Sequence, residues 1–459
     1  MPSFSSAGVG SGLDVNGLVA QLVAAERAPR QQRITRQEID VSTNLSALGT
    51  LKGALGAFKA ALDPLKSLDA FRVRKATSAD EKVFTATAGT SAQPGSYNIE
   101  VVDIAKAHQL SSAAFAAGST AVVGTGTVTL TLGSTSTAVS IDSTNNTLAG
   151  IASAINSKSD NPGILATLVH GVGGSRLVLT SSKTGATNAI RVTQSGGDGG
   201  LNQLVYDPPG TTNLTQLAPA QDASIKIQGI DHASASNVIS TAIDGVTITL
   251  KSTLPGTQIA LDVAYDVAAA TDRVNKFVKE YNALQAQAAR LRSYNPDTKA
   301  AGPMLGDALL NGVENQIRRG LNDPISGLSG TYQSLASIGI KTTASGALEV
   351  DAAKLKTALE TSFDAVGAIF ASTSGVAARL YTQLETRLSG SAEIESRTVG
   401  LNNTLKQIAK DKTALDLRME QIESRYRKQF TALDVLLSQL QSTSSYLSQQ
   451  LANLPKIGS

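Results

Sequence analysis

Three histidines are the residues best suited to hold a metal ion or to transfer a proton. His108, His170 and His232 lie far apart in the sequence, whereas metal ligands usually recur a few residues apart. A metal site would need all three side chains to converge in space with carboxylates. We therefore expect surface or edge-strand histidines, with no metal ion and no other cofactor.

Nucleophilic catalysis and phosphate binding have no supporting motif either. The chain contains no cysteine, which excludes a thiolate zinc site, a cysteine nucleophile and a disulfide framework. No Gly-x-Ser-x-Gly elbow lies between a strand and a helix, although the order of residues alone leaves a Ser-His-Asp triad open. The glycine-rich residues 171–174 lack the lysine of a phosphate loop, and we expect a hairpin turn there.

The composition suits extended, modest cores better than one dense globule. At roughly 100–200 residues per domain, the 459 residues suggest several domains, and only 17% of residues are charged and 4% aromatic. The net charge of +3 gives no electrostatic case for binding nucleic acid or an anionic membrane. No stretch approaches the ~18 apolar residues of a membrane span, and residues 1–15 lack the regions of a secretory signal.

Basic residues cluster on or beside helical segments near both ends of the chain. They are Arg27, Arg30, Arg33, Arg36, Arg418, Arg425, Arg427 and Lys428. Acidic residues are interleaved with them and stacking aromatics are absent, which argues against nucleic acid. A solvated face and a face between subunits both stay open.

Hydrophobic periodicity predicts helices at both ends of the chain. The C-terminal apolar positions alternate mostly between steps of three and four from Leu401 to Leu454, with Lys412 and Ser444 at two skipped positions. This is a heptad pattern, typical of a coiled-coil seam. A matching N-terminal pattern runs over residues 34–65, and we expect Pro29 to separate it from a shorter helix. The two ends are expected to pair with each other or with neighbouring copies.

The period changes to two between about residues 71 and 266, which predicts antiparallel strands with one buried face. A short helix is expected at residues 148–156 within this region. Helical periodicity then resumes from Val267 onward, with a strand-like segment at Leu348–Val350 and Asp351 placed to cap the next helix.

Four local strings, in this order, resemble the family of bacterial flagellar filament cap proteins (FliD, flagellar hook-associated protein 2). They are Ser11-Gly12-Leu13-Asp14 with the helix after it, Pro94–Val101 with residues 105–110, Ile243–Lys251 with residues 277–282, and Gln429–Asp434 with residues 445–451. Residues 148–156 followed by 176–181 resemble the β-α-β motif of flagellins and hook-associated proteins. The match is weakest around residues 113–213.

The resemblance implies an α+β multidomain fold in which the β-rich domains form a nested insertion. A terminal coiled-coil leg domain would comprise residues 1–44 and 402–459, and a helical domain residues 45–72 and 267–401. A β domain would comprise residues 73–107 and 218–266, and a distal inserted β domain with the β-α-β motif residues 108–217. Several copies would form a ring, a pentamer by resemblance.

The resemblance also implies a structural role rather than an enzyme. The ring would cap the tip of the flagellar filament and promote folding and insertion of exported flagellin. Its expected partners are flagellin, the hook–filament junction proteins and a cytosolic export chaperone, and the type III channel would carry the chain out of the cell. We expect self-assembly or filament contact through the helical seam at Leu18, Leu22, Phe430, Leu433, Leu437, Leu440, Leu447 and Leu451.

An alternative from another class is an extracellular adhesin. Its distal β domains would bind glycans for cell adhesion, while the helices would serve only as an anchor. The C-terminal seam distinguishes the two, because an adhesin needs an anchor at one end only, whereas the family match covers both ends. The two roles are compatible within one chain.

Overall fold

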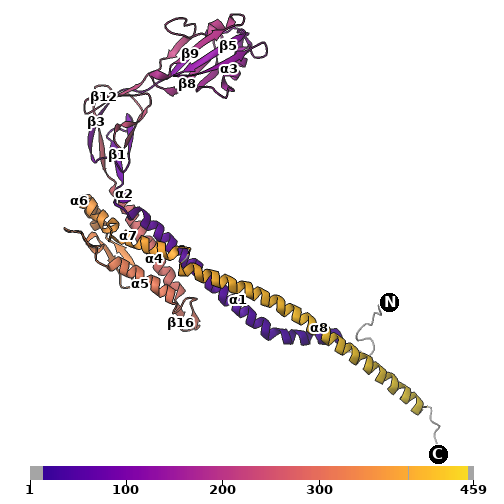
Figure 1. Ribbon diagram of the computed structural model, residues 1–459. Helices are drawn as coiled ribbons and strands as arrows, with labels where there is room; N and C mark the ends of the chain where they lie inside the picture. Colours follow the sequence, from indigo (N-terminus) through magenta and orange to yellow (C-terminus); the bar gives the residue numbers. More distant parts are fainter. Residues whose placement is uncertain (1–13, 391, 453–459) are drawn as a thin grey trace, which may run out of the picture. The chain divides into compact units, whose positions relative to one another are not determined.

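The computed structural model describes residues 14–390 and 392–452, which divide into two compact units. The first unit, Met1–Leu68 with Thr271–Ser459, is helical, and the second, Asp69–Ala270, is mostly β-sheet (Figure 1). This confirms an α+β multidomain fold with a β-rich insertion between helical ends. The division into four domains remains a prediction. The outermost residues of the predicted leg domain, 1–13 and 453–459, lie outside the described residues.

The helical unit is built around two long terminal helices, α1 and α8. Its helices are α1 (Val15–Leu62), α5 (Ala308–Asn322), α6 (Ala352–Ala371), α7 (Val376–Leu388) and α8 (Glu393–Ala452). Two more helices, α2 (Leu68–Phe71) and α4 (Val267–Leu291), cross the border between the two units. Two small antiparallel hairpins join β16 (Tyr294–Asn295) to β17 (Ala300–Ala301) and β18 (Ile340–Thr342) to β19 (Leu348–Val350). Asp351 caps α6 as predicted, accepting a hydrogen bond from Lys354 N at 3.1 Å.

Helix α1 runs unbroken through Pro29, so the predicted break at this proline is wrong. A proline inside a helix removes one hydrogen bond and costs about 3 kcal/mol. Pro29 and Ala25, whose carbonyl loses its partner, are both exposed, so water can hydrate that carbonyl. Val23 and Ile34 pack against α8 on either side of the proline, and this packing outweighs the local cost.

Aromatic side chains form the centre of the helical layer. The rings of Phe58 in α1 and Phe277 in α4 lie 5.8 Å apart, and Phe277 is also 5.8 Å from Phe370 in α6. All three are fully buried. Pairs of aromatic rings at this separation add about 0.5–1.5 kcal/mol beyond their buried area, so these rings fasten α1 to the helices that follow the β-rich insertion.

One part of the β-rich unit is a pair of sheets around its own apolar core. The first sheet has the strand order β1-β15-β3-β11-β12 and the second β13-β14-β2, and all pairs are antiparallel. The strands are β1 (Arg74–Ser78), β2 (Phe84–Ala88), β3 (Gly95–Asp103), β11 (Ala223–Ile227), β12 (Ile230–Ser234), β13 (Val238–Ile243), β14 (Val246–Leu250) and β15 (Ile259–Tyr265). The alternation expected in β14 is present, with Val246, Ile248 and Leu250 buried.

The other part is inserted between β3 and β11 and has a separate core. Its antiparallel sheets have the orders β10-β4-β8-β7 and β6-β5-β9. The elements are β4 (Ala107–Ser111), β5 (Gly126–Leu132), β6 (Thr135–Ile141), α3 (Leu148–Asn156), β7 (Ile164–Gly171), β8 (Gly174–Thr184), β9 (Ile190–Ser195) and β10 (Thr215–Ala218). The predicted short helix is confirmed as α3, and the predicted hairpin turn joins β7 to β8.

Truncating the central aromatic ring should destabilise the helical unit. Phe277→Ala is expected to lower the free energy of unfolding by about 3–5 kcal/mol, because it removes a buried ring and leaves a cavity. Denaturant unfolding followed by circular dichroism measures the change. The exposed Lys276→Ala on the same helix is the control and should stay within about 0.5 kcal/mol. A loss below 1 kcal/mol for Phe277→Ala would contradict this core assignment.

Candidate assembly surface

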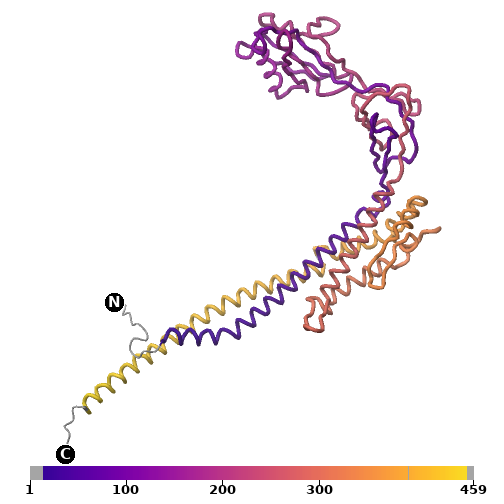
Figure 2. The backbone as a smooth tube through the Cα atoms, turned by 180° about the vertical axis from the view of Figure 1, so that it is seen from behind, coloured from indigo at the N-terminus to yellow at the C-terminus, as the bar shows by residue number. Residues whose placement is uncertain are grey.

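The two ends of the chain meet where α1 and α8 run side by side in antiparallel directions, from the Lys52–Glu395 ion pair to the Arg427–Asn16 hydrogen bond (Figures 1 and 2). The buried apolar core of this helix pair is Ile34, Ile408, Leu415, Met419 and Ile422, flanked by Val23, Val41 and Tyr426. The steps of three and four read from the sequence are the ones that face α1. This inner part of the heptad pattern therefore pairs the ends of one chain.

Polar contacts fix the register of this helix pair. Lys412, at one of the skipped seam positions, forms an ion pair with Glu38, and Arg27 forms one with Asp416. Arg427 Nη1 donates to Asn16 Oδ1 at 2.6 Å. Partly exposed ion pairs contribute only about 0–1 kcal/mol each, so they select the alignment of the helices while the apolar core stabilises it.

Beyond Arg427, helix α8 runs past the start of α1 and continues to Ala452 (Figure 2). Leu433 is 45%, Leu440 57% and Leu451 67% exposed there. Leu447 is exposed too, whereas Phe430 and Leu437 are half-buried. We call these residues the apolar stripe; they are Phe430, Leu433, Leu437, Leu440, Leu447 and Leu451.

The apolar stripe continues the direction of the seam that packs on α1. At 100° per residue, Leu433 and Leu451 project from α8 in the same direction as the buried Leu415. The stripe differs from the seam in its position along the helix, because it lies beyond Arg427, which contacts Asn16 near the start of α1.

The predicted seam residues of α1 are partly exposed in the single chain, and their role in assembly remains a prediction. Leu18 and Leu22 are 37% and 41% exposed, whereas Val15 and Val19 are buried. Steps of four from Val15 through Val19 to Val23 were the sequence signal that could have found the buried face. The structure thus places all eight predicted seam residues on the outer parts of α1 and α8, and none of them in the described core of the helix pair.

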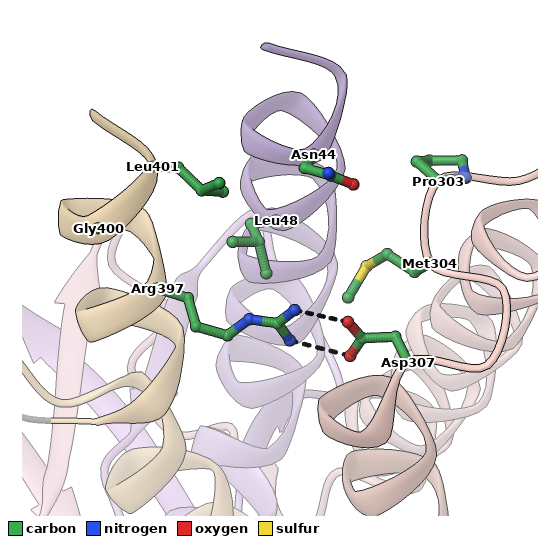
Figure 3. A pocket seen from close by; sticks show the side chains of 8 residues that line it. All are labelled: Asn44, Leu48, Pro303, Met304, Asp307, Arg397, Gly400 and Leu401. Atoms are coloured by element: carbon green, nitrogen blue, oxygen red, sulfur yellow. Dashed lines mark hydrogen bonds and ion pairs between the residues drawn. The ribbon is translucent and has the colours of Figure 1, made fainter. Parts of the chain in front are cut away.

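An ion pair joins α8 to the helical layer beside a hollow of about 430 Å³ (Figure 3). Arg397 donates two hydrogen bonds to the Asp307 carboxylate, at 3.0 and 2.7 Å. Asp307 also caps α5 by accepting from Leu309 N and Leu310 N. The hydrogen bond from Arg397 and these backbone donors hold the pKa of Asp307 below its ordinary value. The group anchors two helices, and the described residues that line the hollow include no Ser, Thr or Cys.

Comparisons with known proteins decide the family. Family models described as the flagellar hook-associated protein 2 C-terminus and N-terminus match residues 220–442 and 11–108. A B-type flagellar hook-associated protein 2 of Pseudomonas aeruginosa is 33% identical over 98% of both chains, and one of Escherichia coli K12 is 33% identical over 99% of both. The chain belongs to the flagellar hook-associated protein 2 family.

Structural similarity agrees with this family. A crystal structure of the D1-D2-D3 domains of the flagellar cap protein FliD from Escherichia coli has a TM-score of 0.67 and 30% identity, covering 78% of this chain and 99% of that chain. A family model described as the flagellin hook IN motif matches residues 127–183. This range contains the predicted β-α-β motif at residues 148–156 and 176–181. The predictions of a flagellar cap protein and of a flagellar location are confirmed. Nothing in the relatives supports the adhesin alternative, and their names describe no enzymatic activity.

The three histidines lie on three different strands, β4, β7 and β12. His170 and His232 lie in β7 and β12, at the edges of their sheets as expected. The expectation is wrong for His108, which is buried in β4 between two neighbouring strands. Its Nδ1 accepts from Ile190 N at 2.9 Å, which satisfies the buried ring, and burial lowers its pKa. Within residues 14–390 and 392–452, no three His, Asp or Glu side chains could hold a metal, and no helix could cross a membrane.

The Asp307–Arg397 pair predicts a pH dependence of stability. Because the folded pKa of Asp307 lies below the unfolded value of 3.8, its contribution is complete well above pH 3.8 and is lost as the pH falls through the folded pKa. Asp307→Asn keeps a capping side chain but should cost about 1 kcal/mol at pH 7. Denaturant unfolding from pH 2.5 to 7 should show the wild-type advantage shrinking below pH 4. The exposed Asp297→Asn is the control, and an advantage that is constant with pH would contradict the assignment.

Proposed function

We propose that this chain forms a homo-oligomeric ring at the tip of the bacterial flagellar filament and promotes folding and insertion of exported flagellin. Its place in the cap-protein family supports the role. The observation that carries the assembly is the apolar stripe, which lies on a helix that the described part of the chain leaves uncovered. The ring, the contact with flagellin and the tip location are parts of this proposal.

The energetics of the apolar stripe favour self-association. Fully burying one leucine side chain stabilises by roughly 1.5–3 kcal/mol, and four leucines of the stripe are about half exposed or more. A long helix without a packed face is marginal in water. Burial against the terminal helices of neighbouring copies would remove this exposure. The mixed residues at the seam positions do not specify the subunit number, and a pentamer rests on the family resemblance.

The action of the ring is mechanical. Its contacts with the filament must break and re-form as each flagellin subunit is added. Small polar residues interrupt the outer part of α8, at Ser438, Ser444, Ser445 and Ser448. They bury little apolar surface, which would keep the contacts weak enough to exchange. In this proposal the helical ends hold the filament, and the β-rich unit covers the space in which flagellin folds.

Further partners follow from the same proposal. The ring would meet the hook–filament junction proteins before a filament exists. A cytosolic export chaperone would cover the apolar stripe before export through the flagellar type III channel. Each of these partners would use a surface that is apolar and exposed in the single chain.

Charges placed within the apolar stripe should disrupt the ring. Leu433→Asp with Leu437→Asp should weaken association by about 100-fold or more, because at least about 3 kcal/mol of burial is lost per contact. Light scattering over a concentration series should then report monomer where the wild type is oligomeric. Gln439→Asp with Ser442→Asp adds the same charge on the same segment and is the control. A wild-type chain that stays monomeric at every concentration would end the self-assembly proposal.

Removal of the protein should stop filament growth without stopping flagellin export. In cells that lack it, hooks should be present, filaments absent and flagellin found as monomer in the medium. Electron microscopy and immunoblotting of the medium test this, with the restored gene as the control. Filaments of normal length in such cells would contradict the cap function.

A further inference from the structure

The two sides of the helix pair carry very different charges. On one side, the cations of both helices are neutralised within the chain. The ion pairs there are Arg27–Asp416, Lys412–Glu38 and Arg427–Glu423. Glu420 is exposed on this side and has no cation as partner among the described residues, so the side is left net negative. We call Asp416, Glu420 and Glu423 the carboxylate face.

The other side of the helix pair carries arginines without counter-ions. Arg30, Arg33, Arg418 and Arg425 are exposed, and none of them forms an ion pair within the described chain. We call these four residues the arginine face. Arg30, Arg33 and Arg418 line one groove between α1 and α8, and Arg418 and Arg425 line the next.

The acids beside the arginine face have partners of their own. Asp411, which lines the first groove, accepts a hydrogen bond from Gln407 at 2.9 Å. Glu26, in the second groove, accepts one from the Tyr426 hydroxyl at 3.2 Å. Both contacts are with uncharged groups, so two carboxylates stand against four arginines and the side is net positive.

Both faces lie at the same level of the helix pair and point in opposite directions. Residues two apart on an α-helix project about 200° from each other. Arg418 stands between Asp416 and Glu420 in the sequence, and Arg425 follows Glu423 by two. Each of these arginines therefore points away from a carboxylate that lies only about 3 Å along the axis.

We propose that the arginine face of one copy meets the carboxylate face of its neighbour in the ring. The inference rests on the proposed ring and names the surfaces by which the copies meet. A closed ring with one rotation axis requires a contact between two different faces at the same axial level, and the helix pair offers such faces with opposite charge. Asp416 Oδ1 and Glu423 Oε1 hold the arginines of their own chain, which leaves one oxygen of each carboxylate for the neighbour.

The charged faces would determine the orientation in which two copies meet, and the apolar stripe would supply most of the affinity between them. Complementary charges speed the encounter and select partners more than they add affinity. Two arginine faces repel each other, which disfavours a two-fold dimer of helix pairs and leaves the head-to-tail order that a ring needs. The neighbour recognised by the arginine face is thus a second copy of this chain.

Charge reversal on each face tests the proposal with full-length protein at low salt. One variant carries Arg418→Glu and Arg425→Glu, and the other Glu420→Arg and Glu423→Arg. Each alone should associate at least tenfold more weakly than wild type in sedimentation experiments, and a chain that carries all four reversals should recover association. Lys406→Glu with Lys410→Glu, exposed on the outer side of α8, is the matched control and should change association less than twofold.

Cross-linking gives an independent measurement, because the chain has no cysteine of its own. Ala414→Cys lies between the grooves of the arginine face, and the exposed Thr413→Cys lies at nearly the same level on the side of Glu420, seven residues before it. Mixing the two variants should give an interchain disulfide that neither gives alone.

The outcomes separate the face assignment from the ring. If the wild type assembles and the arginine-face variant associates as strongly as the control, the face assignment is wrong and the ring proposal is unaffected. A strong 414–414 cross-link within one variant would overturn it as well. A wild type that never assembles would overturn both proposals.

Discussion

The antiparallel pairing of α1 with α8 is the interaction on which the rest of the molecule depends. Its buried core joins residues nearly 400 positions apart in the sequence, such as Ile34 with Leu415. Because the two ends of the chain pack on each other, the β-rich unit is an insertion within the helical unit. The chain enters it from the helical unit and returns to the helical unit after it. Apolar burial supplies the stability of the pair, while Lys412–Glu38 and Arg27–Asp416 fix its alignment.

The same pairing explains why the molecule has a surface to offer to other copies. Helix α8 is aligned with α1 so that Arg427 contacts Asn16 near the start of α1, and residues 428–452 of α8 extend beyond this contact. The apolar stripe is on this extension. It points in the same direction as the internal seam, so its position along α8, beyond Arg427, separates the surface used within the chain from the surface left for assembly.

Periodicity predicted the helical ends, the alternating strands and helix α3, because each follows from a local pattern of burial. Contacts between distant residues were not predictable in this way. Pro29 was expected to end a helix, but packing by Val23 and Ile34 keeps the helix intact. His108 is buried, and the group that donates a hydrogen bond to its ring, Ile190 N, lies 82 positions along the chain. The Asp307–Arg397 joint likewise brings together residues with no local signal. The apolar stripe could be predicted from the heptad pattern. The opposite charges on the two sides of the helix pair could not, because they depend on which charged residues of α1 and α8 form ion pairs with each other.

Amide hydrogen exchange of the full-length chain at low and high protein concentration tests the central claim most directly. The account predicts that peptides over residues 430–452 exchange fast in the free chain and become protected as concentration rises. Peptides over residues 405–426, already packed on α1, should keep the same protection throughout. Exchange over 430–452 that does not change with concentration would contradict the claim that the apolar stripe of α8 is the assembly surface.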